Sequence, residues 1–227
     1  MAGALSGAGP RPAAASQAAH RNANEVMMAA NAEPLLMTVE EYRQLPDRED
    51  VIQELHCGTL VTLTRPKMKH AKVQLRLADL LRPKAEHLGV VETEVAFRAL
   101  PEYDLRGADV AFVSRGRWDS TSDDDNLHGS PELVIEVLSP SNTTAEIREK
   151  AVLCLSSGAQ EFWVVDPKRE TVSVTKQGSV PKVHQMGDRI PLSMFDSHLD
   201  VSAIFGVQSV SNVVARPTDR PVYEKSK

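Results

Sequence analysis

The alternation of apolar, β-rich runs with helical patterns constrains the fold of this chain more than any other feature. Three β-rich runs follow one helical pattern and precede a second, and two further runs come after it. We expect strands at residues 90–100, 108–113, 133–138, 162–165 and 171–175, and helices at 68–88 and 143–155. This order predicts a mixed α/β domain, in which helices pack on a central mixed β-sheet.

Short-range signals predict where two helices begin. Thr38 precedes Glu41, and Thr143 precedes Glu146, with the three-residue spacing of a capping box. The first pair predicts a short helix, and the second predicts the start of the helix that runs to residue 155. Gly158 follows as a residue suited to end that helix.

Turn residues define the remaining segments. Residues 51–55 and 60–63 are short apolar runs on either side of Gly58, which predicts a hairpin. Pro83 lies inside the first long helical pattern and is expected to kink or divide it. Residues 192–205 are expected to end the fold with a short helical piece.

The two ends of the chain differ in composition from its middle. Residues 1–36 are rich in Ala, Gly, Pro, Ser and Asn without a sustained period, which predicts a disordered leader. Residues 37–206 are expected to form one folded domain, and residues 207–227 a flexible tail. The pattern begins afresh at Met37, which makes it a candidate native start alongside Met1.

Composition excludes several classes of protein. The two cysteines, Cys57 and Cys154, cannot make a four-ligand structural zinc site or a disulfide framework. The sequence has no apolar stretch long enough to span a membrane and no secretory signal pattern, so we expect a cytoplasmic protein. The formal net charge of -5 argues against a broad electrostatic grip on nucleic acid, so any such contact should be local.

Two acidic residues interrupt strands that are otherwise apolar. Asp109 lies within residues 107–113 and Glu136 within residues 133–138, where an unpaired charge would be costly. Lys150 shares a helical face with core-type residues, and its helix follows the Glu136 strand after a short link. The pattern therefore predicts a cluster of two acids and one lysine. The alternatives are acids in solvent or in structural ion pairs, and a lysine that extends to the surface.

These residues and several short strings together resemble a known family. The chain resembles the Uma-type family of restriction-like endonucleases, within the PD-(D/E)XK nuclease superfamily, from about residue 37 to residue 205. The resemblance is carried by the order and spacing of Glu54–Gly58, Pro66–His70, Ala108–Val110, Glu136–Ser141, Lys150 and Gly158–Pro167. It implies a restriction-endonuclease-like α/β fold and a metal-dependent endonuclease.

The resemblance also implies a metal site. Asp109 and Glu136, with the carbonyl oxygen of Val137, would hold Mg²⁺, or Mn²⁺ as an alternative. Lys150 would orient the attacking water or stabilise charge on the phosphate. Glu54 matches an early family glutamate and would complete the metal shell or bind a second metal, with a surface ion pair as its alternative role.

Three positions depart from the family pattern. Ala108 replaces the proline that usually precedes the first acid, and Leu138 occupies the place of the superfamily's usual lysine. The predicted activity therefore depends on Lys150. Cys154 replaces a frequent tyrosine, which affects the expected packing of that helix but removes no metal ligand.

The expected partner is DNA. His70 is similar to a family histidine that could contact a phosphate or orient Glu54, and Lys67, Lys69 and Lys72 surround it. Arg65 and Arg76 extend this basic segment, although charged helix faces are commonly just solvated. A two-fold homodimer would suit cleavage of both strands of a duplex.

Two alternatives to a DNA endonuclease stay open. The same fold could serve as a catalytically inactive module that binds nucleic acid or protein. The acids and the lysine could also act on another phosphate ester, because they do not specify the polymer.

Overall fold

The structure is a computed structural model that describes residues 36–46 and 51–206. The predicted leader (residues 1–36, apart from Leu36) and the predicted tail (207–227) lie outside the described residues and stay predictions. No helix in the described part combines the length and the apolar character needed to span a membrane.

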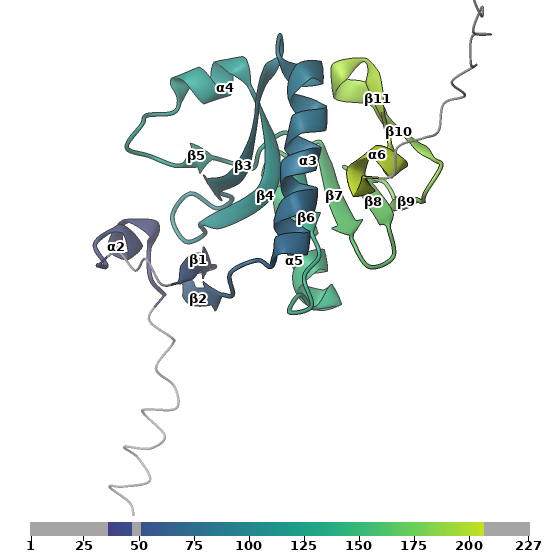
Figure 1. The fold of residues 1–227 in the computed structure, drawn as a ribbon. Helices are drawn as coiled ribbons and strands as arrows, with labels where there is room; N and C mark the ends of the chain where they lie inside the picture. The colour runs from purple at the N-terminus through teal and green to yellow at the C-terminus, as the bar shows by residue number, and fades with distance from the viewer. Residues whose placement is uncertain (1–35, 47–50, 207–227) are drawn as a thin grey trace, which may run out of the picture. The chain divides into compact units, whose positions relative to one another are not determined.

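A mixed sheet forms the centre of the described domain (Figure 1). Its seven strands, counted within the described residues, have the order β5-β3-β4-β6-β7-β8-β9. The pairs β3–β5 and β6–β7 are parallel and the other neighbouring pairs are antiparallel. The strands are β3 (Gly89–Arg98), β4 (Arg106–Ser114), β5 (Leu127–His128), β6 (Leu133–Val137), β7 (Glu161–Asp166), β8 (Thr171–Lys176) and β9 (Lys182–His184). The predicted mixed α/β class is confirmed.

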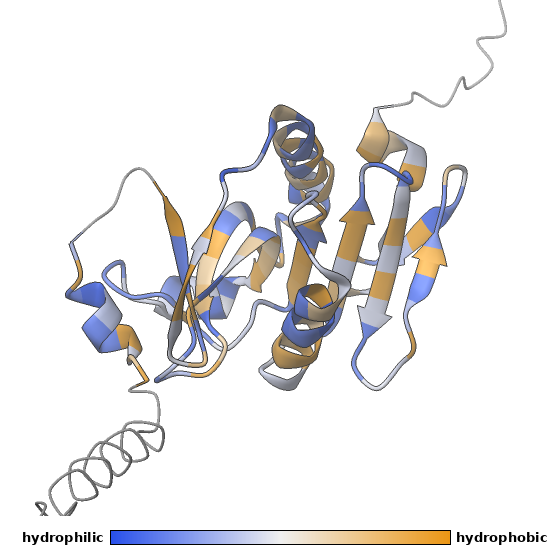
Figure 2. Cartoon of the chain, turned by 90° about the horizontal axis from the view of Figure 1, so that it is seen from below, coloured by the Kyte–Doolittle hydropathy of each residue, from blue (hydrophilic) through white to orange (hydrophobic). Residues whose placement is uncertain are grey.

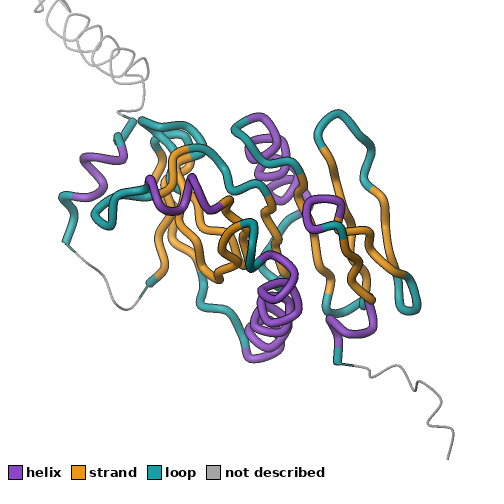
Figure 3. Tube along the Cα trace, turned by 90° about the horizontal axis from the view of Figure 1, so that it is seen from above, coloured by secondary structure: helices purple, strands orange, loops and turns teal. Residues whose placement is uncertain are grey.

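Two long helices cover opposite faces of this sheet, as Figures 2 and 3 show from below and from above. On one face, α3 (Met68–Ala85) buries an apolar stripe against β3, β4 and β6. On the other face, α5 (Thr144–Ser156) packs over a smaller apolar cluster from β3, β4, β6 and β7. Strands buried on both faces explain why their sequences are near-continuous apolar runs.

Two hairpins lie beside the main sheet. β1 (Ile52–His56) pairs with β2 (Thr59–Leu63), and Leu55 forms an isolated bridge with Leu105, just before β4. Gly58 in its turn has a φ of 82°, which glycine adopts without steric cost. β10 (Arg189–Leu192) pairs with β11 (Ser197–Asp200), and the short helix α6 (Val201–Phe205) follows. Through Leu55, the first hairpin is hydrogen-bonded to the segment that leads into β4.

Most predicted elements are present, with some differences. Both predicted capping boxes form, at the starts of α2 (Val39–Arg43) and α5. Pro83 does not divide α3, because it lies in the last turn, so the hydrogen bond that it lacks and its crowding of the preceding turn affect only the end of the helix. Residues 192–205 contain β11 and the 3₁₀ turn η1 (Ser193–Phe195) in addition to the predicted helix. The sequence patterns did not predict α4 (Arg115–Ser120), β5, β9 or β10.

Candidate functional site

Lys150 and Glu136 form an ion pair between α5 and β6. The Lys150 Nζ lies 2.9 Å from Glu136 Oε1, and it donates a 2.6 Å hydrogen bond to the Gly107 carbonyl of β4. Glu136 is 8% exposed and Lys150 is 9% exposed. The structure therefore brings the predicted lysine to the predicted acid, and it rules out a surface position for Lys150.

Glu54 of β1 joins the same group from the hairpin. Its Oε1 accepts a 2.8 Å hydrogen bond from the Gly107 N–H and lies 3.9 Å from Lys150 Nζ. Its Oε2 lies 2.6 Å from His56 Nε2. A Cβ atom at position 107 would come within 3.3 Å of Glu54 Oε1, so glycine gives this carboxylate room beside the strand.

Asp109 of β4 is held by groups from two neighbouring elements. Its Oδ2 accepts a 2.7 Å hydrogen bond from the Val137 N–H of β6 and lies 3.0 Å from His70 Nε2 of α3. We expected His70 to orient Glu54 or to contact a phosphate; its partner in the structure is Asp109. The physical reason is that His70 lies on α3, whereas Glu54 pairs with His56 on its own strand.

The electrostatics of the buried pair follow from its surroundings. Burial raises the pKa of Glu136 to about 8, with a further contribution from Asp109, although Lys150 opposes the shift. Burial lowers the pKa of Lys150, but the carboxylates of Glu136 and Glu54 more than compensate, so its pKa is raised. Lys150 therefore remains a cation at neutral pH, beside a carboxyl group that readily accepts a proton.

The pKa values of Glu54 and His70 are shifted in opposite directions. Burial raises the pKa of Glu54, but hydrogen bonds from His56 and the Gly107 N–H, together with the Lys150 charge, lower it overall. Burial lowers the pKa of His70, but its contact with Asp109 raises it overall. Glu54 is thus held ionised, and His70 is stabilised in its protonated form.

The carboxylates of Asp109 and Glu136 are hard oxygen donors, the kind of ligand that Mg²⁺ prefers. The described side chains form no cluster of three or more His, Cys, Asp and Glu residues close enough to hold a metal. Two carboxylates suffice for Mg²⁺, which retains several waters and uses substrate phosphate as a ligand. Glu136 Oε1 is buried and meets no directed hydrogen-bond donor, although the Lys150 ammonium lies 2.9 Å away. The role of the Val137 carbonyl stays a prediction.

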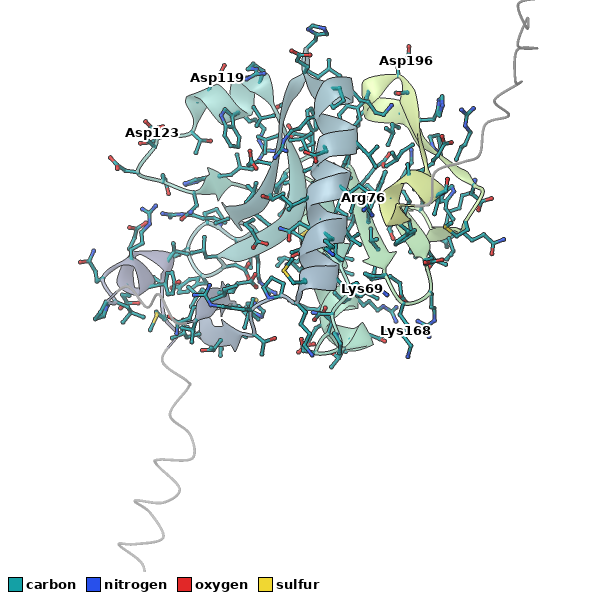
Figure 4. The ribbon with its side chains drawn as sticks, viewed as in Figure 1. Lys69, Arg76, Asp119, Asp123, Lys168 and Asp196 are labelled. Carbon is teal, nitrogen blue, oxygen red and sulfur yellow. The ribbon has the colours of Figure 1, made fainter. Side chains whose placement is uncertain are left out.

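The predicted basic residues divide into two groups. Lys67, Lys69 and Lys72 are exposed at the start of α3, and Figure 4 shows Lys69 near that end of the helix. Arg76 lies further along the same helix and donates a 3.1 Å hydrogen bond to the Ile204 carbonyl of α6. Arg76 therefore packs α3 against α6, and the accessible lysines of the segment lie near His70.

Two residues that the sequence reading missed contact the Asp109 region. Gln74 of α3 donates a 2.8 Å hydrogen bond to the Asp109 carbonyl and a second one to Glu94 of β3. Gln74 is 5% exposed and lies one helical turn after His70. A polar residue within the apolar stripe of a helix was the available signal for Gln74; the sequence offered none for Glu94.

Comparisons with known proteins agree with this architecture. A crystal structure described as a putative nuclease belonging to DUF820, from Anabaena variabilis, superposes with a TM-score of 0.65 at 20% identity. The match covers 74% of this chain and 97% of that one, and at this identity it establishes the fold. No curated protein matches the chain. The family model Uma2, "Putative restriction endonuclease", matches residues 39–202, so the chain belongs to the Uma2 family, as its sequence motifs predicted.

Proposed function

We propose that this protein is a metal-dependent endonuclease that hydrolyses phosphodiester bonds in DNA. The observation that carries the proposal is the buried contact between Lys150 and Glu136, with Asp109 on the adjacent strand β4. Burying a lysine and a carboxylate usually gives little or no stability relative to apolar residues. A catalytic task accounts for the position of these residues better than stability does.

Asp109 and Glu136 would hold Mg²⁺, with Mn²⁺ as an alternative, and the Val137 carbonyl would provide a further oxygen. The ion would polarise the phosphate and lower the pKa of a bound water. His70 and the Val137 N–H fix the Asp109 carboxylate, so its direction is set before substrate arrives.

Lys150 has two roles in this proposal. Its ammonium balances the carboxylates of Glu136 and Glu54 in the absence of substrate. When a phosphate enters, the same ammonium would stabilise negative charge that develops during attack by water. The pKa of Glu54 is lowered, so Glu54 stays ionised, and its negative charge would keep Lys150 protonated.

Lys67, Lys69 and Lys72 support DNA as the substrate, because they form an exposed basic turn next to His70. On a chain of net charge -5, such a local group can bind the phosphate backbone without a broad basic face. A two-fold homodimer would present two such sites to a duplex, which size-exclusion chromatography with light scattering would test.

The same contact between Lys150 and Glu136 is also compatible with the alternative of an inactive binding module. Lys150 lies 2.9 Å from Glu136, so its ammonium occupies part of the space around a carboxylate that a metal would need. In such a module DNA or protein binding would persist after Glu136→Gln, whereas an enzyme would lose metal-dependent cleavage.

The test is cleavage of supercoiled and single-stranded DNA by the full chain with Mg²⁺ or Mn²⁺. Wild type is compared with Asp109→Asn, Glu136→Gln and Lys150→Met, and with Lys168→Met as a control on an exposed turn. We expect cleavage by wild type and the control, and loss of at least about 100-fold in the three site variants. Folded wild type without cleavage under these conditions would overturn the proposal.

A further inference from the structure

Glu94 has an unusual backbone conformation directly opposite Asp109. Its φ is 55°, the left-handed region that residues with a Cβ rarely adopt inside a strand. The β3–β4 ladder pairs Thr93 with Val110 and Val95 with Ala108, and it omits the intervening pair of Glu94 and Asp109. The regular strand geometry is therefore interrupted at the position that faces the first predicted metal ligand.

Gln74 bridges this interruption from α3. Its amide nitrogen donates one hydrogen to a carboxylate oxygen of Glu94 and the other to the Asp109 carbonyl, at 2.8 Å. Both donors of the amide are thus used. A buried polar side chain needs such partners, and here both partners belong to the interrupted pair.

Helix α3 contacts both the side chain and the backbone of Asp109. His70 contacts the Asp109 carboxylate, and Gln74, four residues later, contacts its backbone carbonyl. Residues four apart lie on the same face of a helix, so α3 approaches Asp109 with two adjacent side chains. Glu94 receives its hydrogen bond from Gln74, which orients the Gln74 amide toward the strand.

We propose that Glu94 and Gln74 are positioning residues for Asp109: the left-handed backbone of Glu94 presents its carboxylate to Gln74, which in turn fixes the Asp109 backbone. The catalytic consequence rests on the proposed endonuclease function. The positioning itself does not, because it concerns the location of a carboxylate in the free protein. Strained backbone conformations of this kind are commonly retained near functional sites.

The Val137 amide reports on the position of Asp109 without any activity. Its N–H donates to Asp109 Oδ2, a side-chain oxygen, at 2.7 Å. The next amide in the chain, that of Leu138, donates to the Val165 carbonyl at 2.8 Å. Hydrogen exchange of Val137 should therefore respond to movement of the Asp109 carboxylate, while exchange of Leu138 reports on the sheet as a whole.

Glu170 provides a matched control for Glu94. It is also a glutamate with positive φ, 56°, and it lies in the exposed turn between β7 and β8. Glycine at either position removes the same kind of backbone strain. Only the change at position 94 also removes a partner of Gln74.

The experiment measures hydrogen exchange by NMR, thermal unfolding and DNA cleavage on full-length wild type and four variants: Glu94→Gly, Glu94→Gln, Gln74→Met and Glu170→Gly. Gln74→Met keeps a similar volume without the donors, and Glu94→Gln keeps an oxygen that can accept from Gln74. If Gln74→Met does not fold, Glu94→Gly still tests the inference, because it relieves strain.

We expect Glu94→Gly and Gln74→Met to accelerate Val137 exchange at least about tenfold relative to Leu138, and to lower kcat about 10- to 100-fold with little change in KM. Glu94→Gln should keep Val137 exchange and kcat close to their wild-type values, and Glu170→Gly should alter neither Val137 exchange nor kcat. Glu94→Gly should melt at or above the wild-type temperature, which a merely structural role for the carboxylate does not predict.

Unchanged Val137 exchange in Glu94→Gly would overturn the inference, whether or not wild type cleaves DNA. Accelerated exchange in a wild-type background that does not cleave would support the positioning and overturn the proposed function. Normal cleavage by Glu94→Gly, beside active wild type, would overturn the catalytic consequence.

Discussion

α3 and α5 both carry candidate site residues to the same sheet, but they are attached to it by different forces. α3 is 18 residues long and buries five apolar residues together with His70 and Gln74. α5, described along its whole length, buries Lys150 and Cys154. α3 is thus held mainly by the hydrophobic effect, whereas α5 combines a smaller apolar contact, through Cys154 and partly buried neighbours, with a buried ion pair.

This difference determines which substitutions should detach each helix from the sheet. The buried polar residues of α3, His70 and Gln74, lie in its first two turns, while the following turns hold it in the apolar core. On α5, Lys150 is joined to β4 and β6, and the preceding residue, Glu149, binds Arg106 of β4 at 3.0 Å. The attachment of α5 and the chemistry of the site therefore share the same residues.

The largest effect is expected from Lys150→Met. Removal of the ammonium leaves Glu136 and Glu54 without their shared cation, which should cost about 3–5 kcal/mol in the free energy of unfolding at pH 9. Because the pKa of Glu136 is already raised to about 8, protonation should reduce this cost at pH 6. Urea unfolding at the two pH values measures the difference.

Lys168→Met is the control for that change, since Lys168 is exposed in the turn after β7. Its effect should stay within about 0.5 kcal/mol at both pH values. Equal costs for the two substitutions would show that the buried ion pair does not hold α5.

Leu77→Ala probes the apolar attachment of α3. Leu77 is fully buried between the helix and the sheet, so its truncation should cost about 2–5 kcal/mol, independent of pH. Leu75→Ala on the same helix, where the side chain is 55% exposed, should cost much less. Chemical denaturation of both variants gives the comparison, and a similar loss for both would contradict the apolar stripe.

His70→Gln tests the polar end of α3 through its pH dependence. The pKa of His70 is raised in the folded state, so its contribution to stability is complete below pH 6.5 and is lost as the pH rises through the raised value. Relative to His70→Gln, which can donate but does not titrate, wild type should lose about 1–2 kcal/mol between pH 5.5 and pH 9. If the stability of wild type relative to His70→Gln stayed constant or increased with pH, the predicted role of His70 would be contradicted.

The sequence predicted those features of α3 and α5 that depend on local patterns. The apolar period of residues 68–88 predicted α3, and the Thr143–Glu146 spacing predicted the start of α5. The approach of Lys150 to Glu136 followed from a short link between a strand and the next helix. These features depend on neighbours in the chain, so a single sequence contains them.

Other parts depend on contacts between distant segments. The pairing of His70 with Asp109 joins residues 39 positions apart, and it could not be distinguished from a contact with Glu54. The left-handed conformation of Glu94 has no local signal, because its hydrogen-bond partner Gln74 lies on α3, 20 residues away in the sequence. The β10–β11 hairpin was missed because η1 separates the strands without a typical two-residue turn.

The smallest effect should come from the helix cap, where two matched positions separate stability from function. In both α2 and α5 a threonine accepts from the N–H of a glutamate three residues later, at 3.1 Å for Thr38 and 3.2 Å for Thr143. Thr38→Ala and Thr143→Ala should each cost about 1 kcal/mol in the free energy of unfolding. Only Thr143→Ala should also lower cleavage, by a few-fold, because α5 carries Lys150 and has few buried residues to hold its first turn. Equal cleavage by the two variants would show that the ion pair of Lys150 fixes α5 without help from its cap.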